Sequence, residues 1–181
     1  MIKTLLLVGI AKLFFGVFVA AVGVFLGLRL LGLLLRQKDD DSEVSRGNVA
    51  RGVLQGASLL ALGLLVQHAV VATFDTFDFL YRAHRALGPI LLRLGIYAAI
   101  HVTVSMIVGA AVIAFGTILY NRMTKGVDEL AEVRKGNVAA AIVLASVIIV
   151  IALVAAPGLR TMLDGILPLP ELPRDVVHMS S

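Results

Sequence analysis

Four long apolar runs limit the possible fold of this chain more than any other feature. They cover about Leu5–Leu35, Gly47–Ala72, Leu92–Tyr120 and Gly136–Ala156. Apolar runs of about 18 residues or more with few charges are typical of membrane-spanning segments. Because lipid offers no hydrogen bonds to the backbone, each run is predicted to be an α-helix. The fold class predicted is therefore an all-α integral membrane protein with four transmembrane helices.

The composition agrees with a membrane location and excludes several kinds of chemistry. The chain is 59% hydrophobic and 15% charged, whereas soluble domains are about 45–50% apolar and about 25% charged. It has no cysteine, so disulfides and thiolate sites are excluded. The net charge of +4 comes from basic residues near the ends of the apolar runs, as expected beside anionic headgroups. We expect the lipid bilayer as a partner, and no nucleic acid.

One polar-to-apolar junction is written twice in the sequence. The segment "EVSRGNVARG" begins at Glu43 and "EVRKGNVAAA" begins at Glu132. An ungapped shift of 89 positions, which carries Gly47 onto Gly136, superimposes the two copies. The chain is thus predicted to be a duplicated two-helix hairpin. Since two spans separate the junctions, both lie on one side of the membrane, which makes the hairpins parallel repeats with pseudo-two-fold symmetry about the membrane normal.

The pattern predicts four segments along the chain. Residues 1–78 form the first repeat, 79–91 an interfacial connector, 92–158 the second repeat, and 159–181 an interfacial and proline-rich tail. The mixture of aromatic and charged residues in "TFDTFDFLYRAHRALGP" is typical of a segment that lies in the membrane interface. Pro157 and Gly158 are expected to end the fourth span.

The junction residues form the first candidate site, and they are Glu43, Gly47, Asn48, Glu132, Gly136 and Asn137. The acidic residues are expected in the first turns of the helix that enters the membrane, where carboxylates complement the positive helix end. The glycines are expected to allow close helix approach, as are Gly23 with Gly27 and Gly52 with Gly56. Two interpretations of the asparagines stay open. They cap helices at the water–lipid boundary, or they face each other across the pseudo-axis and fix hairpin pairing.

At these junctions the sequence resembles the bacterial family of domain of unknown function 350, the YjfL-like inner-membrane proteins. The resemblance rests on the acidic–x–x–Glu–x–x–Lys/Arg–Gly–Asn–Val–Ala junction, its duplication and the four spans, and it extends from the first span to Pro157. It implies a bacterial inner-membrane location and brings no catalytic residue. One departure is that Arg51 and Gln55 in the first copy replace Ala140 and Leu144 of the second.

Three ionisable side chains form the second candidate site. Lys12 lies in the first span, its counterpart after the shift is His101, and His68 approaches the same depth. Such residues are costly inside a membrane and suggest function. In one interpretation they line a path for protons or small ions. In the other, Lys12 extends to the interface, His68 is interfacial, and His101 bonds a hydroxyl such as that of Thr103 or Ser105.

No catalytic, metal-binding or cofactor-binding pattern emerges from the sequence, and the acidic run Asp39–Asp41 is expected to be a solvated face. We therefore expect a non-enzymatic structural or accessory subunit of a membrane assembly, which self-associates or binds partner subunits. The alternative is a small channel or transporter subunit. More basic residues flank the junctions than the termini, which predicts cytoplasmic junctions and external termini.

Overall fold

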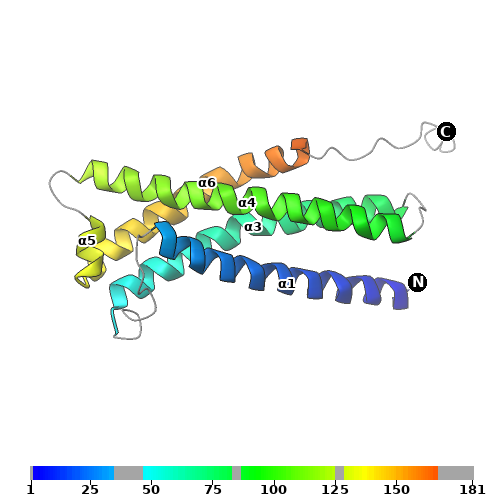
Figure 1. Cartoon of the computed structure of the whole chain (residues 1–181), viewed down its shortest axis with the longest axis horizontal. Coiled ribbons are helices and arrows are strands. Elements are labelled where there is room, and N and C mark those ends of the chain that lie inside the picture. Colours follow the sequence, from blue (N-terminus) through cyan, green and yellow to red (C-terminus); the bar gives the residue numbers. More distant parts are fainter. Residues whose placement is uncertain (1, 35–46, 83–86, 125–128, 167–181) are drawn as a thin grey trace.

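The structure is a computed structural model that describes residues 2–34, 47–82, 87–124 and 129–166. The described chain contains four long helices and one short helix, and no strand (Figure 1). These are α1 (Ile2–Leu34), α3 (Val49–Arg82), α4 (Leu87–Met123), α5 (Glu129–Arg134) and α6 (Val138–Ile166). Each long helix contains a stretch that is long and apolar enough to cross a membrane. The prediction of an all-α, multi-pass membrane protein is confirmed.

The two Gly–Asn junctions lie at one end of the molecule. The start of α3, the short helix α5 and the start of α6 are together there, whereas the start of α1 lies at the opposite end (Figure 1). We call α1 with α3 the first hairpin, and α4 with α6 the second hairpin. Glu43 and the acidic run before it lie outside the described residues.

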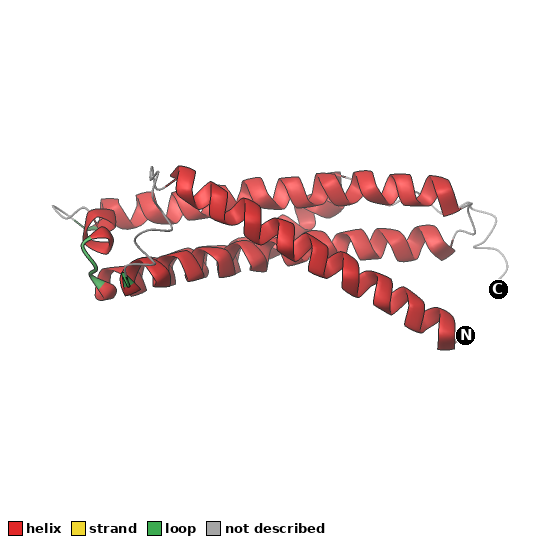
Figure 2. Ribbon diagram, turned by 60° about the horizontal axis from the view of Figure 1, so that its bottom comes forward, coloured by secondary structure: helices red, strands yellow, loops and turns green. Residues whose placement is uncertain are grey.

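Three of the four long helices form the core. Helix α3 makes its most extensive contact with α6, and α4 packs against both of them. Helix α1 packs mainly on α3 and crosses its neighbours at an angle (Figure 2). Only 6% of the α1 span is buried, compared with 50% of the α3 span and 33% of each of the other two. The result is a three-helix core with α1 attached to one side of α3.

Within each hairpin, a glycine on the first helix packs on two aliphatic side chains of the second helix. The contacts are Gly27 with Leu59 and Leu62, and Gly116 with Ile148 and Ile151. The shift of 89 positions carries every member of the first set onto the second. A Cβ atom added to Gly27 would lie 2.8 Å from Leu62 Cδ1, so any larger residue at this position would make the Leu62 side chain shift. At Gly52 and Gly56 an added Cβ would meet nothing within 4 Å in the described chain, so this pair makes no close helix approach within one chain.

Helix α3 extends beyond the end that we predicted for the second span. We expected it to leave the membrane at Ala72, but it continues as one helix to Arg82. Thr73 and Thr76 are buried (1% and 3% exposed), and each hydroxyl donates to the carbonyl four residues before it. Because both hydroxyls form hydrogen bonds within the helix, this segment stays helical and packed although it contains polar residues.

Helix α6 also continues past its predicted end at Pro157 and Gly158. It runs to Ile166, while residues 167–181 of the predicted tail lie outside the described residues. Leu159 and Leu163 are 3% and 0% exposed and belong to the core. Their packing holds the last two turns, because a proline is tolerated in a membrane helix where neighbouring helices compensate.

Candidate functional site

Glycine is needed at both junctions for its backbone conformation. The φ angles are +84° at Gly47 and +90° at Gly136, in the left-handed region that favours glycine. At the second junction Gly136 N–H donates to Val133 C=O and Asn137 N–H donates to Glu132 C=O, each over 3.0 Å. This pair of bonds is the Schellman motif that ends α5. A Cβ at either glycine would meet nothing within 4 Å among the described atoms, so close helix approach is not the reason for these glycines.

The asparagines cap the two helices that follow. Asn48 Oδ1 accepts a hydrogen bond from Arg51 N–H over 3.1 Å, and Asn137 Oδ1 accepts one from Ala140 N–H over 3.2 Å. In the usual N-cap arrangement, the side-chain oxygen accepts a hydrogen bond from the backbone N–H of the residue two or three positions later. Gly–Asn therefore turns the chain with its first residue and starts a helix with its second.

The amide nitrogens of the two asparagines have different partners. Asn48 Nδ2 donates to the backbone carbonyl of Arg134 over 3.1 Å, whereas Asn137 Nδ2 donates to Glu132 Oε2 over 3.4 Å. Asn48 thus ties the start of α3 to the end of α5 and joins the two junctions. The side chains of Asn48 and Asn137 do not bond each other, and Asn48 instead reaches the second junction through the backbone carbonyl of Arg134.

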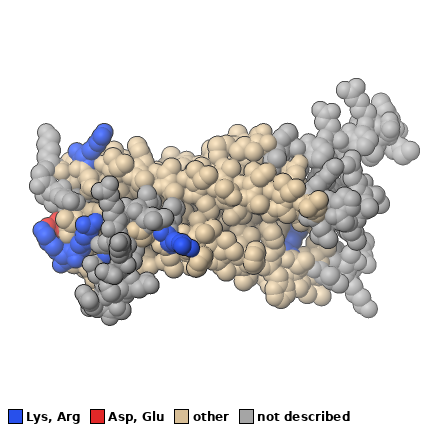
Figure 3. Space-filling view, in the orientation of Figure 1, with Lys and Arg blue, Asp and Glu red and all other residues tan. Residues whose placement is uncertain are grey.

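Glu132 lies in α5 and not in the first turn of the membrane helix, where we expected it. Its Oε1 accepts a hydrogen bond and ion pair from Lys135 Nζ over 2.8 Å. The hydrogen bond from Lys135 is the main reason that the pKa of Glu132 is lowered, and the bond from Asn137 adds to it. The expectation failed because the left-handed Gly136 separates α5 from α6. Lysine and arginine side chains gather on the surface at this end of the molecule (Figure 3).

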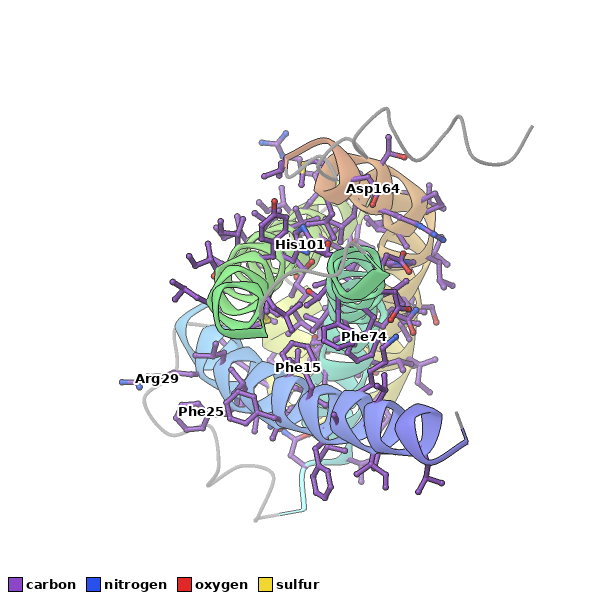
Figure 4. The ribbon with its side chains drawn as sticks, turned by 90° about the vertical axis from the view of Figure 1, so that its right-hand side faces the viewer. Phe15, Phe25, Arg29, Phe74, His101 and Asp164 are labelled. Atoms are coloured by element: carbon purple, nitrogen blue, oxygen red, sulfur yellow. The ribbon has the colours of Figure 1, made fainter. Side chains whose placement is uncertain are left out.

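At the opposite end, Lys12 is held by an ion pair. Its Nζ lies 2.7 and 2.8 Å from the two carboxylate oxygens of Asp78 on α3. The ammonium also lies 5.3 Å from the ring centre of Phe74 and 5.9 Å from that of Phe77, within cation–π range. Phe15 packs on Phe74, with ring centres 5.6 Å apart (Figure 4). The sequence analysis did not predict this ion pair.

His101 is on α4 and packs inside the core, against a different side of α3 from the one that Lys12 contacts. It is 2% exposed, and its Nδ1 lies 3.4 Å from Thr73 Oγ1. The Thr73 hydroxyl donates to Ala69 C=O over 2.7 Å, and the imidazole tautomer sets which group donates in the longer contact with Nδ1. In the described part of the chain, His101 Nε2 and the buried Ser105 Oγ have no hydrogen-bond partner. His101 thus contacts a hydroxyl, but that of Thr73 rather than those of Thr103 or Ser105.

The three residues of the predicted polar path are not joined. Lys12 and His101 contact α3 at nearly the same depth but on different faces, as the positions of Phe74 and His101 show (Figure 4). His68 is half-buried, and none of the bonds found in the described chain connects it with Lys12 or His101.

The repeat carries an acidic counterpart that sequence reasoning missed. The shift of 89 positions carries Asp75 onto Asp164, and the carboxylate of Asp164 on α6 interacts electrostatically with His101 (Figure 4). Each hairpin thus has a carboxylate near the end of its second helix, but Lys12 pairs with Asp78, whose counterpart is Leu167, and not with Asp75. Extending the 89-residue comparison to the ends of the spans would have found this pattern.

The helical fold and its apolar spans define the class of a multi-pass α-helical membrane protein. A family model described as Domain of Unknown Function (DUF350) matches residues 4–103 and again residues 92–167. The chain belongs to this family, in two tandem copies, which confirms the resemblance found at the junctions. No curated protein and no solved structure matches the chain.

Proposed function

We propose that this protein is a non-enzymatic structural or accessory subunit of an assembly in the bacterial inner membrane, which self-associates or binds partner subunits. Its two hairpins are related by a pseudo-two-fold axis along the membrane normal. The observation that carries the proposal is the exposure of α1, whose span is 6% buried although it belongs to a hairpin that repeats a well-packed one. A helix so loosely held within one chain is suited to contact another.

The repeated contacts support the symmetry of the hairpins. Gly27 and Gly116 pack on aligned side chains, and Asn48 and Asn137 cap aligned helices. The basic surface at the junction end (Figure 3) supports cytoplasmic junctions and external termini.

The proposal is tested by extracting the protein from bacterial membranes into lipid nanodiscs with a membrane-solubilising polymer and measuring particle mass. The expected result is a protein mass that exceeds one chain of 19.2 kDa, as a multiple of it or with stoichiometric partners. A population that consists of single chains contradicts the proposal. The measurement requires the full chain, because the proposed contact surfaces lie in the membrane spans.

A second candidate is a small ion or proton channel or transporter subunit, with Lys12, His68 and His101 as its polar layer. The observation in its favour is that His101 Nε2 and Ser105 Oγ are buried without partners in the described chain, since unsatisfied buried polar groups are costly and suggest a functional use. Proton and potassium flux into liposomes that contain the purified protein tests it. Flux that His101→Leu and Lys12→Leu abolish supports the channel; an absence of flux, or flux that survives both changes, rejects it.

A further inference from the structure

Within the described residues, no helix packs into a groove that lies between α1 and α3. Its volume is about 350 Å³, and small residues line it, among them Gly16, Ala20 and Gly23 of α1 and Gly63 of α3. Ala20 and Gly63 are exposed. Small residues let a helix approach closely in a membrane. The exposed amide of Gln67 also lines the groove, and an amide in lipid is more stable with a polar partner.

The corresponding groove of the second hairpin is filled. The shift carries Gly16, Ala20 and Gly63 onto Ser105, Gly109 and Ala152, all of which are buried. The filling helix is α3, because Leu62 and Leu65 lie directly against Gly109. Leu65 is fully buried in this position.

The repeat also indicates which helix would fill the open groove. The counterpart of α3 is α6, and the residues aligned with Leu62 and Leu65 are Ile151 and Val154. Ile151 is half-buried against Gly116, and Val154 is 76% exposed. Val150, which is aligned with the buried Ala61, is 57% exposed. One chain therefore exposes two surfaces, the groove between α1 and α3 and an apolar ridge on α6. The alignment of the two repeats shows that the ridge of α6 corresponds to the part of α3 that fills the groove of the second hairpin.

We propose that α6 of a second copy packs into the groove between α1 and α3, with Val154 beside Ala20 as Leu65 lies beside Gly109. This inference rests on the proposed self-association and specifies its surfaces. The chain's own α6 is held on another side of α3 (Figure 4), where Leu144 and Ile148 are fully buried. To reach the groove within one chain, α6 would have to leave that core.

Engineered thiols test the inference, because the chain has no cysteine of its own. One tagged chain carries Ala20→Cys and a second, differently tagged chain carries Val154→Cys. The two are co-expressed and oxidised in native membranes. The expected product is a disulfide-linked dimer that contains both tags. The matched control replaces Ala20→Cys by Phe18→Cys, because Phe18 and its counterpart Ile107 are 66% and 64% exposed and Phe18 is not a lining residue of the groove. The mixed dimer should form several-fold more with Ala20→Cys than with this control.

Two results would overturn the inference. Mixed dimer no more abundant than in the control shows that lipid or an unrelated protein fills the groove. A chain with both Ala20→Cys and Val154→Cys that forms only an internal disulfide shows that the groove closes on its own α6. If the nanodisc particles nevertheless contain several subunits, the proposed function survives and only these surfaces are wrong. If they contain single chains, both proposals fail.

Discussion

The two hairpins share their internal contacts but differ in what surrounds them. Both place a glycine of the first helix against aliphatic side chains of the second, and both begin the second helix with a capping asparagine. Yet Ile148 is fully buried, whereas its counterpart Leu59 is only half-buried. Residues 83–86 join α3 to α4, which packs against it, and no such connection joins α6 to α1. The duplication therefore reproduces the contacts within each hairpin. The order of the helices along the chain decides which hairpin has its groove filled by a third helix.

Lys12 in the first hairpin and its counterpart His101 in the second hairpin also differ in how deeply they are buried. The Lys12 side chain is 27% exposed and is paired with Asp78, whereas His101 is 2% exposed. An imidazole is uncharged in one of its forms near neutral pH, so it is less costly to bury than an ammonium. The first hairpin therefore has a lysine at this position, and the second hairpin has a histidine.

The largest effect is expected from truncating the aligned aliphatic contacts. Ile148→Ala should lower the free energy of unfolding by about 2–4 kcal/mol, since it leaves a cavity in the three-helix core. Leu59→Ala should cost less than half as much, because Leu59 is only half-buried within the chain. Reversible unfolding in mixed micelles or bicelles measures both. Equal losses of stability at the two positions would mean that α1 is as well packed as α4. They would contradict the conclusion that the two hairpins differ in their surroundings.

The next effect concerns the left-handed glycines, which should respond alike because their φ angles agree. Gly47→Ala and Gly136→Ala should each destabilise the fold by about 1–2 kcal/mol, the cost of a left-handed conformation for a residue with a Cβ atom. Gly52→Ala is the control, since that glycine is helical with room for a Cβ and alanine favours a helix. The same unfolding assay applies. A loss at Gly52 as large as at the junctions would argue against conformational strain as the cause.

A smaller effect separates the two asparagines. Asn48→Asp keeps the capping oxygen but removes the donor to Arg134 C=O, so it should cost about 0.5–1 kcal/mol. Asn48→Ala, which also loses the cap, should cost about 1–2 kcal/mol in total and more than Asn137→Ala. The three unfolding free energies, measured in one lipid mixture, decide the order. If Asn48→Asp is silent, the hydrogen bond between the repeats does not stabilise the fold.

Sequence reasoning predicted the elements of this fold well because lipid makes helicity obligatory and the duplication is ungapped. It placed the spans, the tandem repeat and the shared end of both junctions. It did not predict the helix ends at Arg82 and Ile166, because buried threonines and leucines there stabilise segments whose local sequence favours a break. Tertiary packing outweighed the local signals at Pro157.

The candidate sites were harder to predict because they depend on which helix faces are in contact. Asn48 and Arg134 are 86 residues apart, and their bond requires α5 to fold back on the start of α3. Likewise, depth alone grouped Lys12 with His101, but α3 lies between them. The position of a residue along its span gives its depth in the membrane; it does not give the helix toward which that residue points when three other helices surround it.

The smallest effect is a pH dependence that belongs to the second junction. The pKa of Glu132 is lowered in the folded state by its bond with Lys135, so the unfolded chain, with a glutamate pKa of about 4.3, binds a proton first as the pH falls. The stabilisation is therefore complete above that unfolded-state value and disappears as the pH falls through the lower folded-state pKa. Glu132→Gln should flatten the acid limb of the unfolding free energy slightly, because the pair is exposed and screened by solvent. Lys135→Gln, which removes the partner and keeps the carboxylate, should have the same effect. An acid limb that Lys135→Gln leaves unchanged would show that this ion pair adds nothing to the stability of the α5 turn.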